Sequence, residues 1–312
     1  MIHIICPNPA LDRTIFLKNF QVNGVSRANS SSDSLGGKGF NVIRSFLVGP
    51  PVDFTIYSFL GGYTGKYLES LIKESTMNHM ITQIMETTRI CSIIVDENHK
   101  HAHLINEQGP LIHEEEKKKF IDDIISNIKA GDTAIFSGSL PEGLSENFYQ
   151  SIIEQLNKKN VKSVLDSSGK CLTYGVEAEP WLIKINKDEF AELMGTDIED
   201  KNSLKEELTN ISSSSNYIIT LGSEGCIAKI NGKIYEVKLP KVNAKNATAS
   251  GDIFLGALVK TLINSKNANE ALLEASAYSL SNCLYWYPNI ASSDIKKYKN
   301  KIEVTKQGES PL

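Results

Sequence analysis

Residues 133–166 read TAIFSGSLPEGLSENFYQSIIEQLNKKNVKSVLD, and the fold class can be predicted from this segment. The apolar run Thr133–Ser137 predicts a strand, Ser145 predicts the cap of a helix that runs to about Asn157, and Val161–Asp166 predicts the next strand. Strands that alternate with helices in this way are typical of a mostly parallel sheet covered by helices on both faces.

The same alternation extends toward both ends of the chain. Toward the N-terminus, we predict strands at Ile2–Cys6 and Phe54–Leu60, and helices at Thr64–Glu74 and His113–Lys129. Toward the C-terminus, we predict strands at Trp181–Ile185 and Tyr217–Leu221, a helix at Lys187–Met194 that Gly195 ends, a hairpin that turns at Asn231-Gly232, and helices at Gly251–Asn264 and Ala268–Trp286.

Two segments depart from this pattern. Arg13–Arg27 and Arg89–Ile105 look like strands with no helix between them. They predict a small β-element outside the main sheet, formed by approximately residues 12–34 and 88–108.

The composition is that of a soluble globular protein. Of 312 residues, 41% are hydrophobic and 22% charged, and the net charge of −4 is spread along the chain, which argues against a nucleic-acid-binding surface. The first residues have no basic flank and no run of about 18 apolar residues occurs, so neither a signal peptide nor a membrane-spanning helix is expected. The five scattered cysteines are expected to be reduced thiols, which predicts a cytoplasmic location.

A glycine-rich motif, Gly36-Gly37-Lys38-Gly39-Phe40-Asn41, is the first candidate site. Its glycines would let the backbone approach a ligand closely, and its lysine supplies a charge. The glycine spacing does not match a dinucleotide fingerprint, and residues 29–34 are not predicted to be a strand. No Gly-Lys pair is followed by Ser or Thr, which excludes a P-loop. A plain glycine turn before a helix is the alternative.

A second motif, Asn246-Ala247-Thr248-Ala249-Ser250-Gly251-Asp252, precedes an apolar helix. Small residues before a helix expose free backbone N–H groups to an anion. An aspartate at that end, next to bound phosphates, is well placed to take a proton from a hydroxyl. The alternative for this motif is an ordinary helix cap.

Together with four further motifs, these two resemble the ribokinase-like (PfkB) family of carbohydrate kinases. Gly36–Arg44 is similar to its N-terminal signature and residues 246–257 to its C-terminal signature. The other similar motifs are Pro7–Asp12, Ser137–Pro141, Lys184–Glu189 and Thr220–Gly225. The Asn-Pro-x-x-Asp start and the Ser-Gly-Ser-Leu-Pro turn resemble the branch that contains 1-phosphofructokinase and tagatose-6-phosphate kinase.

The resemblance implies a single ribokinase-like domain over residues 1–312, a three-layer α/β/α fold whose small β-element is a lid over the sugar. It implies ATP-dependent phosphorylation of a ketohexose phosphate, with fructose 1-phosphate ranked before tagatose 6-phosphate, and with ATP and Mg²⁺ required. Neither nucleic acid nor a membrane is expected as a partner. A homodimer through the lid is one option, and the sequence leaves the oligomeric state, any allosteric regulation and the choice of ketohexose phosphate open.

The resemblance also implies roles for individual residues. Asp252 would be the catalytic base, and Asn186 and Glu189 would organise Mg²⁺ and its waters. The sugar side would comprise Asp12, Gly37, Asn41 and Ser137, with Lys38, Arg89 and Arg27 on the existing phosphate. The ATP side would comprise Lys184, Asn186, Thr220, Gly222, Gly225, Ala249, Ser250 and Gly251, with Asn282 near the nucleoside. The cluster of cations argues against a kinase for unphosphorylated sugars or nucleosides, because a neutral substrate does not need it.

Two further features carry open alternatives. His99, His101 and His103 alternate and would share one face of a strand, where they could bind Zn²⁺ or Ni²⁺, but we favour an exposed lid strand. Ala249 stands where the family usually has glycine, which leaves open a protein that binds ATP or sugar phosphate without turnover. We expect a negative φ at Ala249, so that the alanine is tolerated and the enzyme is active.

Overall fold

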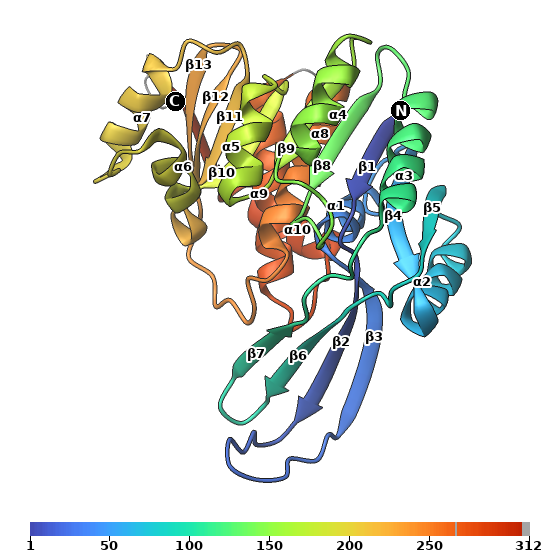
Figure 1. Ribbon diagram of the computed structural model, residues 1–312. Coiled ribbons are helices and arrows are strands. Elements are labelled where there is room, and N and C mark those ends of the chain that lie inside the picture. Colours follow the sequence, from blue (N-terminus) through green and yellow to red (C-terminus); the bar gives the residue numbers. More distant parts are fainter. Residues whose placement is uncertain (266, 308–312) are drawn as a thin grey trace.

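The computed structural model describes residues 1–265 and 267–307 and shows an α/β fold built on a ten-stranded sheet (Figure 1). The strand order is β14-β13-β12-β11-β10-β9-β8-β1-β4-β5; the strands from β11 to β5 pair in parallel, and β12, β13 and β14 are antiparallel. The strands are β1 (Ile2–Cys6), β4 (Phe54–Gly61), β5 (His79–Ile84), β8 (Thr133–Ser137), β9 (Lys162–Asp166), β10 (Leu182–Asn186), β11 (Asn216–Thr220), β12 (Cys226–Ile230), β13 (Lys233–Lys238) and β14 (Glu303–Lys306).

Helices cover both faces of this sheet, because buried strand residues alternate between two hydrophobic cores. Ile4, for example, lies in one core and Ile5 in the other. The first core includes residues of α1 (Lys38–Phe46), α2 (Gly62–Glu74), α8 (Ser250–Ser265), α9 (Ala268–Cys283) and α10 (Ser292–Lys299). The second includes residues of α3 (Glu114–Asn127), α4 (Phe148–Asn157), α5 (Gly169–Glu177), α6 (Lys187–Met194) and α7 (Lys201–Asn210). The predicted three-layer α/β/α fold is confirmed.

A separate four-stranded sheet, hereafter the small sheet, projects from one edge of this body (Figure 1). Its order is β3-β2-β6-β7, formed by β2 (Ala10–Leu17), β3 (Ser30–Gly36), β6 (Ile90–Asp96) and β7 (His101–Asn106). The two segments that departed from the strand–helix pattern therefore meet, and β2 pairs with β6 in parallel.

The prediction that residues 29–34 are not a strand is wrong. Ser30–Gly36 is a strand, β3, which pairs with β2 along its length. It carries no alternating apolar pattern because it is an edge strand that is largely exposed, so its backbone hydrogen bonds hold it in place rather than a buried face.

Most long elements lie where the sequence predicts them, and short ones account for the differences. Gly195 ends α6 in the left-handed conformation, and the turn at Asn231-Gly232 joins antiparallel strands. The cap predicted at Ser145 is wrong, because α4 begins at Phe148 after Asn147. The strands β5 and β14 and the helices α5, α7 and α10 were not predicted. No helix within the described residues is long and apolar enough to cross a membrane.

Candidate active site

The two sequence motifs meet at the N-termini of α1 and α8. Gly37, with φ of 95°, precedes α1, and a Cβ there would lie 3.2 Å from the carbonyl oxygen of Asn8. A Cβ at Gly36 would lie 2.1 Å from the carboxyl group of Asp12. Glycine is needed here because both positions are in close contact with the segment that carries Asp12.

Both carboxylate oxygens of Asp252, in the first turn of α8, have partners from α1. The Asn41 side chain donates a hydrogen bond to Oδ2 at 3.1 Å, and the Lys38 Nζ lies 2.8 Å from Oδ1. Asp252 is 6% exposed, so these contacts form in a mostly desolvated place. The carboxylate is therefore oriented by an amide and neutralised by an ammonium, at the N-terminus of a helix.

Asp166, at the carboxyl end of β9, extends this arrangement and was not predicted as a site residue. Its Oδ2 lies 3.2 Å from the Nζ of Lys38 and 3.3 Å from the Nζ of Lys184. Burial would raise the pKa of Asp166, but Lys184 and Lys38 outweigh it and lower the pKa. Burial likewise opposes the charge of Lys38, yet Asp166 and Asp252 raise its pKa above the usual value. The position of Asp166 at the carboxyl end of a parallel strand, where ligands bind in such sheets, was the sequence signal that could have identified it as a site residue.

The loop before α8 corrects one prediction. Ala249 has φ of 65°, so the expectation of a negative φ is wrong. The carbonyl of Ala249 accepts hydrogen bonds from the backbone N–H groups of Asp252 and Ile253, so a left-handed residue here starts the helix. A Cβ at Gly251 would lie 3.0 Å from the Lys184 Nζ, which shows how closely that ammonium approaches the loop.

Asn282 holds the loop before α8 through two hydrogen bonds. Its side-chain amide donates to the carbonyl oxygen of Thr248 at 2.7 Å and to the Oγ of Ser250 at 2.8 Å, and the side chain is buried. The structure thus shows Asn282 bracing the loop. It is 1% exposed, which leaves it little surface for contact with a nucleoside.

Asp12, which is predicted to bind the sugar, is 9% exposed. Burial raises the pKa of Asp12 to about 6, against the opposing effect of Arg44 and Arg89. The guanidinium of Arg89 donates to the carbonyl oxygens of Asn8 and Glu107, at the base of the small sheet. Arg44 donates to the carbonyl oxygen of Leu35 at 2.8 Å and was not predicted to be a site residue, although it closes the N-terminal motif.

Two predicted sugar-side residues lie differently. Arg27 is exposed in the connection between β2 and β3. This connection lies at the end of the small sheet away from the main sheet (Figure 1). Within the described part of the chain Arg27 makes no hydrogen bond or ion pair with the other predicted site residues. Ser137 is fully buried at the end of β8, and its Oγ has no hydrogen-bond partner among the described residues.

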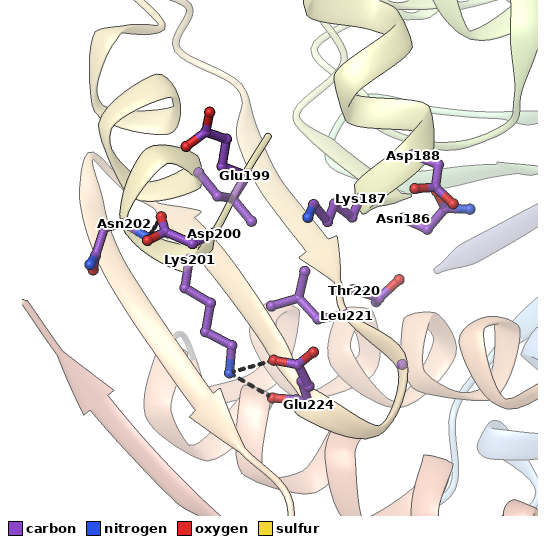
Figure 2. Close-up of a pocket in the computed structure, with 12 residues that line it drawn as sticks. Asn186, Lys187, Asp188, Glu199, Asp200, Lys201, Asn202, Thr220, Leu221 and Glu224 are labelled. Atoms are coloured by element: carbon purple, nitrogen blue, oxygen red, sulfur yellow. Dashed lines mark hydrogen bonds and ion pairs between the residues drawn. The ribbon is translucent and has the colours of Figure 1, made fainter. Parts of the chain in front are cut away.

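An open cleft of about 680 Å³ lies beside residues predicted to bind ATP, and this size is within the range of about 300–1,000 Å³ that is typical of small-molecule sites. Figure 2 shows its walls: the starts of α6 and α7 and the segment that follows β11. The predicted residues Asn186, Thr220 and Gly222 line it. Gly225 instead shapes the turn, since its φ is 96° and a Cβ there would meet the carbonyl oxygen of Val237.

Asn186 and Glu189 form a capping box at the start of α6. The Asn186 Oδ1 accepts from the Glu189 backbone N–H, and the Glu189 Oε2 accepts from the Asn186 backbone N–H, both at 2.8 Å. One glutamate oxygen remains for a ligand. One carboxylate fits Mg²⁺, which keeps several waters and is held by one or two carboxylates and by substrate phosphates.

The three alternating histidines, His99, His101 and His103, do not all lie on one strand. His101 and His103 lie on β7, whereas His99 lies in the preceding turn, where its Nδ1 is 2.9 Å from the Oδ2 of Asp96. Among residues 1–265 and 267–307, no group of three or more His, Cys, Asp or Glu side chains could hold a metal ion by itself.

The chain is similar to known proteins in both sequence and fold. The pattern of the pfkB family of carbohydrate kinases matches residues 8–285. The tagatose-6-phosphate kinase of Staphylococcus epidermidis is 32% identical over 291 residues, 91% of this chain and 92% of the relative. Escherichia coli phosphofructokinase-2 in complex with substrates and products has a TM-score of 0.90 at 21% identity, and its complex with fructose-6-phosphate 0.88 at 21%; each covers 96% of this chain and 98% of that chain. The motifs, the fold and the paired helix N-termini thus lead to one conclusion: the chain belongs to the pfkB family of carbohydrate kinases.

Proposed function

We propose that the protein transfers the γ-phosphoryl group of ATP to a hydroxyl group of a ketohexose phosphate. The observation that carries the proposal is Asp252, a buried carboxylate at a helix N-terminus whose two oxygens are held by Asn41 and Lys38. As a pfkB-family kinase the chain uses ATP, and the cleft lined by Asn186 and Thr220 provides space for a nucleotide.

In the proposed reaction, Asp252 accepts the proton of the attacking hydroxyl as its oxygen bonds to the γ-phosphorus. The bond from that phosphorus to the bridging oxygen breaks, and ADP and a sugar bisphosphate leave. The N–H groups at the start of α8 and the ammonium groups of Lys38 and Lys184 offset the charge on the transferring group. Mg²⁺, when bound, would neutralise nucleotide phosphates, and Glu189 and Asn186 would hold its waters.

The position of Lys38 suggests a division of labour among the cations. Its ammonium contacts Asp252 directly, so we assign it to the reacting phosphoryl group. Arg89 and Arg44 lie around Asp12 instead, and we assign them to the far end of the sugar, where the existing phosphate would be. Each charged contact of this kind contributes roughly 1.5–3 kcal/mol.

For the acceptor, we place tagatose 6-phosphate before fructose 1-phosphate, because the relative at 32% identity is a tagatose-6-phosphate kinase. A coupled assay of ADP release over a panel of free and phosphorylated sugars tests this. We expect a ketohexose phosphate to give the highest kcat/KM, at least about a hundredfold above its free sugar, since the lost contacts amount to roughly 3 kcal/mol. Equal use of the free sugars would refute the proposal.

A catalytically impaired binding protein is the second candidate, and one observation favours it. Ala249 holds a left-handed conformation that disfavours a side chain, at the loop where the phosphates would bind. Binding of ATP and sugar phosphate without ADP release in the same panel would identify it.

We also propose that the small sheet is a lid over the sugar and provides a dimer contact. Leu104 and Ile105 on β7 are 45% and 56% exposed, and as consecutive strand residues they place one apolar side chain on each face of the small sheet. Sedimentation of wild type and Ile105→Lys tests this: the wild type should sediment as a dimer that the substitution weakens, and a monomeric wild type would contradict it.

A further inference from the structure

The helices α1 and α8 form a parallel pair whose N-termini both open onto the candidate site. Their contacts follow one another turn by turn, starting with the Asn41–Asp252 hydrogen bond. One turn further on, a Cβ at Gly256 would lie 2.2 Å from the Oγ of Ser45 and 2.5 Å from the carbonyl oxygen of Val42. The two helices therefore approach so closely that only glycine fits between them.

Lys260 makes the last contact of this series, two turns beyond Asp252. Its buried Nζ donates to the carbonyl oxygens of Ser45 at 2.5 Å and Val48 at 2.8 Å, and to the hydroxyl of Tyr278 at 3.1 Å. The Tyr278 hydroxyl in turn donates to Val48. An ammonium group has three N–H donors, and each has an acceptor here, whereas a neutral amine has only two.

The surroundings of Lys260 offer carbonyls and a ring rather than a carboxylate. Among the described residues no carboxylate lies within ion-pair distance of its Nζ, and the Tyr278 ring lies 4.3 Å from it. The titratable groups that face it are Tyr278 and Glu274, both on α9, and Glu274 is paired with Lys299 at 2.8 Å. Burial lowers the pKa of Lys260 to about 8, against a smaller opposing effect of Glu274. An apolar side chain would fill this space without the cost of burying a charge.

We propose that Lys260 is a positioning residue whose ammonium clamps the C-terminal end of α1 to α8, and so holds Asn41 and Lys38 in register with Asp252. The carbonyls at the end of α1 carry the negative pole of that helix, which a cation stabilises. Loss of the proton removes one of the three hydrogen bonds. The end of α1 opposite the site is then free to shift against α8, and the Asn41–Asp252 contact loosens.

The test compares the pH dependence of kcat, between pH 6 and pH 10 at saturating substrates, in wild type, Lys260→Arg and Lys260→Met. For the wild type we expect kcat to fall above about pH 8. Lys260→Arg should retain activity at higher pH, because arginine keeps its charge. Lys260→Met should lose about tenfold or more in kcat at pH 7 and lose this alkaline decline, as expected when a pre-formed alignment is lost.

A matched control is Lys229→Met. Lys229 also donates to a main-chain carbonyl, that of Ile211 at 2.5 Å, but it lies on β12 and its hydrogen bond is to the end of α7. This variant should keep the wild-type kcat and pH dependence. The proposal is overturned if Lys260→Met keeps both the wild-type kcat and the alkaline decline.

The pH dependence of the free energy of unfolding distinguishes a positioning role of Lys260 from a purely structural role. Because the pKa of Lys260 is lower in the folded chain than the usual 10.5, the unfolded chain binds more protons between about pH 8 and pH 10.5. This group therefore makes the wild type more stable as pH rises through that window, while we expect kcat to fall. If kcat instead rises together with stability over this pH window, or stays constant, the proposed clamp is contradicted.

The activity assay rests on the proposed function. A measurement made without substrate therefore distinguishes a failure of the proposed function from a failure of the role proposed for Lys260. If the wild type phosphorylates no sugar phosphate, the proposed function fails, and hydrogen exchange of the α1 amides tests the clamp by itself. Lys260→Met should exchange faster than wild type over α1 and equally over α3, and Lys260→Arg should match the wild type. Unchanged exchange over α1 in Lys260→Met would overturn the inference.

Discussion

The proposed catalytic end and the proposed nucleotide end of the candidate site are built differently. At the proposed catalytic end, ion pairs link Asp252 to Lys38, Lys38 to Asp166, and Asp166 to Lys184. The two aspartates and Lys184 are buried, whereas the Lys38 side chain is 38% exposed. At the nucleotide end, Asn186 is exposed on an open cleft, and the main hydrogen bonds of Asn186 and Glu189 are those that cap α6.

The difference suggests that the two ends work by different means. Charges at the catalytic end are positioned by one another before any substrate arrives, which lowers the cost of reorganisation during phosphoryl transfer. The nucleotide end presents capped helix ends and turns, so binding there depends more on backbone shape and on the charges that the nucleotide brings. Substitutions at the two ends should therefore differ in kind as well as in size.

Asp252→Asn should have the largest effect. Removal of a general base typically costs about 10²–10⁴-fold in kcat. Asparagine keeps the size of the side chain, so the affinity for an ATP analogue, measured by calorimetry, should change little. Asp122→Asn, at an exposed position on α3, serves as the control and should match the wild type. A variant at position 252 that keeps more than half of its kcat would exclude the assigned role.

Lys38→Met and Arg89→Ala should separate the reacting end of the sugar from its far end. Each removes a charged contact of roughly 1.5–3 kcal/mol, or about 10- to 150-fold. We expect Lys38→Met to lower kcat, because its ammonium contacts Asp252, and Arg89→Ala to raise the KM for the sugar phosphate. Steady-state kinetics with both substrates varied decide between them. If Lys38→Met raises only the sugar KM, Lys38 binds the existing phosphate instead.

The raised pKa of Asp12 predicts a pH dependence that is confined to kcat/KM for the sugar phosphate. Because this pKa is raised to about 6, the carboxylate that would accept sugar hydroxyls is lost below that pH. The kcat/KM for the sugar phosphate should then fall about tenfold per pH unit. The folded chain holds this proton more tightly than the usual pKa of 3.8, so this group lowers stability as pH rises from 3.8 to about 6. Asp12→Asn should abolish the acidic decline, and its persistence would assign the decline elsewhere.

Glu189→Gln probes the nucleotide end. Glutamine can replace glutamate in a capping box, so the thermal stability should be nearly unchanged. The Mg²⁺ concentration for half-maximal rate should rise roughly tenfold, the lower range for loss of a group that orients metal ligands. Glu192→Gln, an exposed glutamate further along α6 that does not line the cleft, is the matched control. An unchanged Mg²⁺ requirement would leave Glu189 with a structural role alone.

The sequence predicted the eight inner strands of the main sheet and most of the helices, because buried strands and amphipathic helices leave a periodic pattern. It did not predict the edge strands β5 and β14. It did not predict β3, since an exposed edge strand of serines has no such pattern. It placed Asp252 and Asn41 through local motifs. It missed Asp166 and Arg44 as site residues, because their importance arises from contacts between distant segments, such as the 3.2 Å approach of Lys38 to Asp166. The sign of φ at Ala249 likewise depends on contacts between segments that are distant in the sequence.

Ala249→Gly should have the smallest effect, and its sign is informative. A side chain in the left-handed region costs about 1–2 kcal/mol, and the greater freedom of glycine in the unfolded chain offsets roughly 0.4–1 kcal/mol of the gain. We therefore expect the variant to be more stable by about 0 to 1.6 kcal/mol in denaturant unfolding. The nearby Ala247→Gly should be less stable by roughly 0.5–1 kcal/mol, since it has no such strain to relieve. Because Asp252, Lys38 and Asn41 remain in contact, kcat for Ala249→Gly should change by less than about tenfold, or 1.4 kcal/mol of barrier. A wild type that is inactive on every sugar and is rescued a thousandfold by glycine would show instead that Ala249 has disabled the loop, in favour of the binding protein.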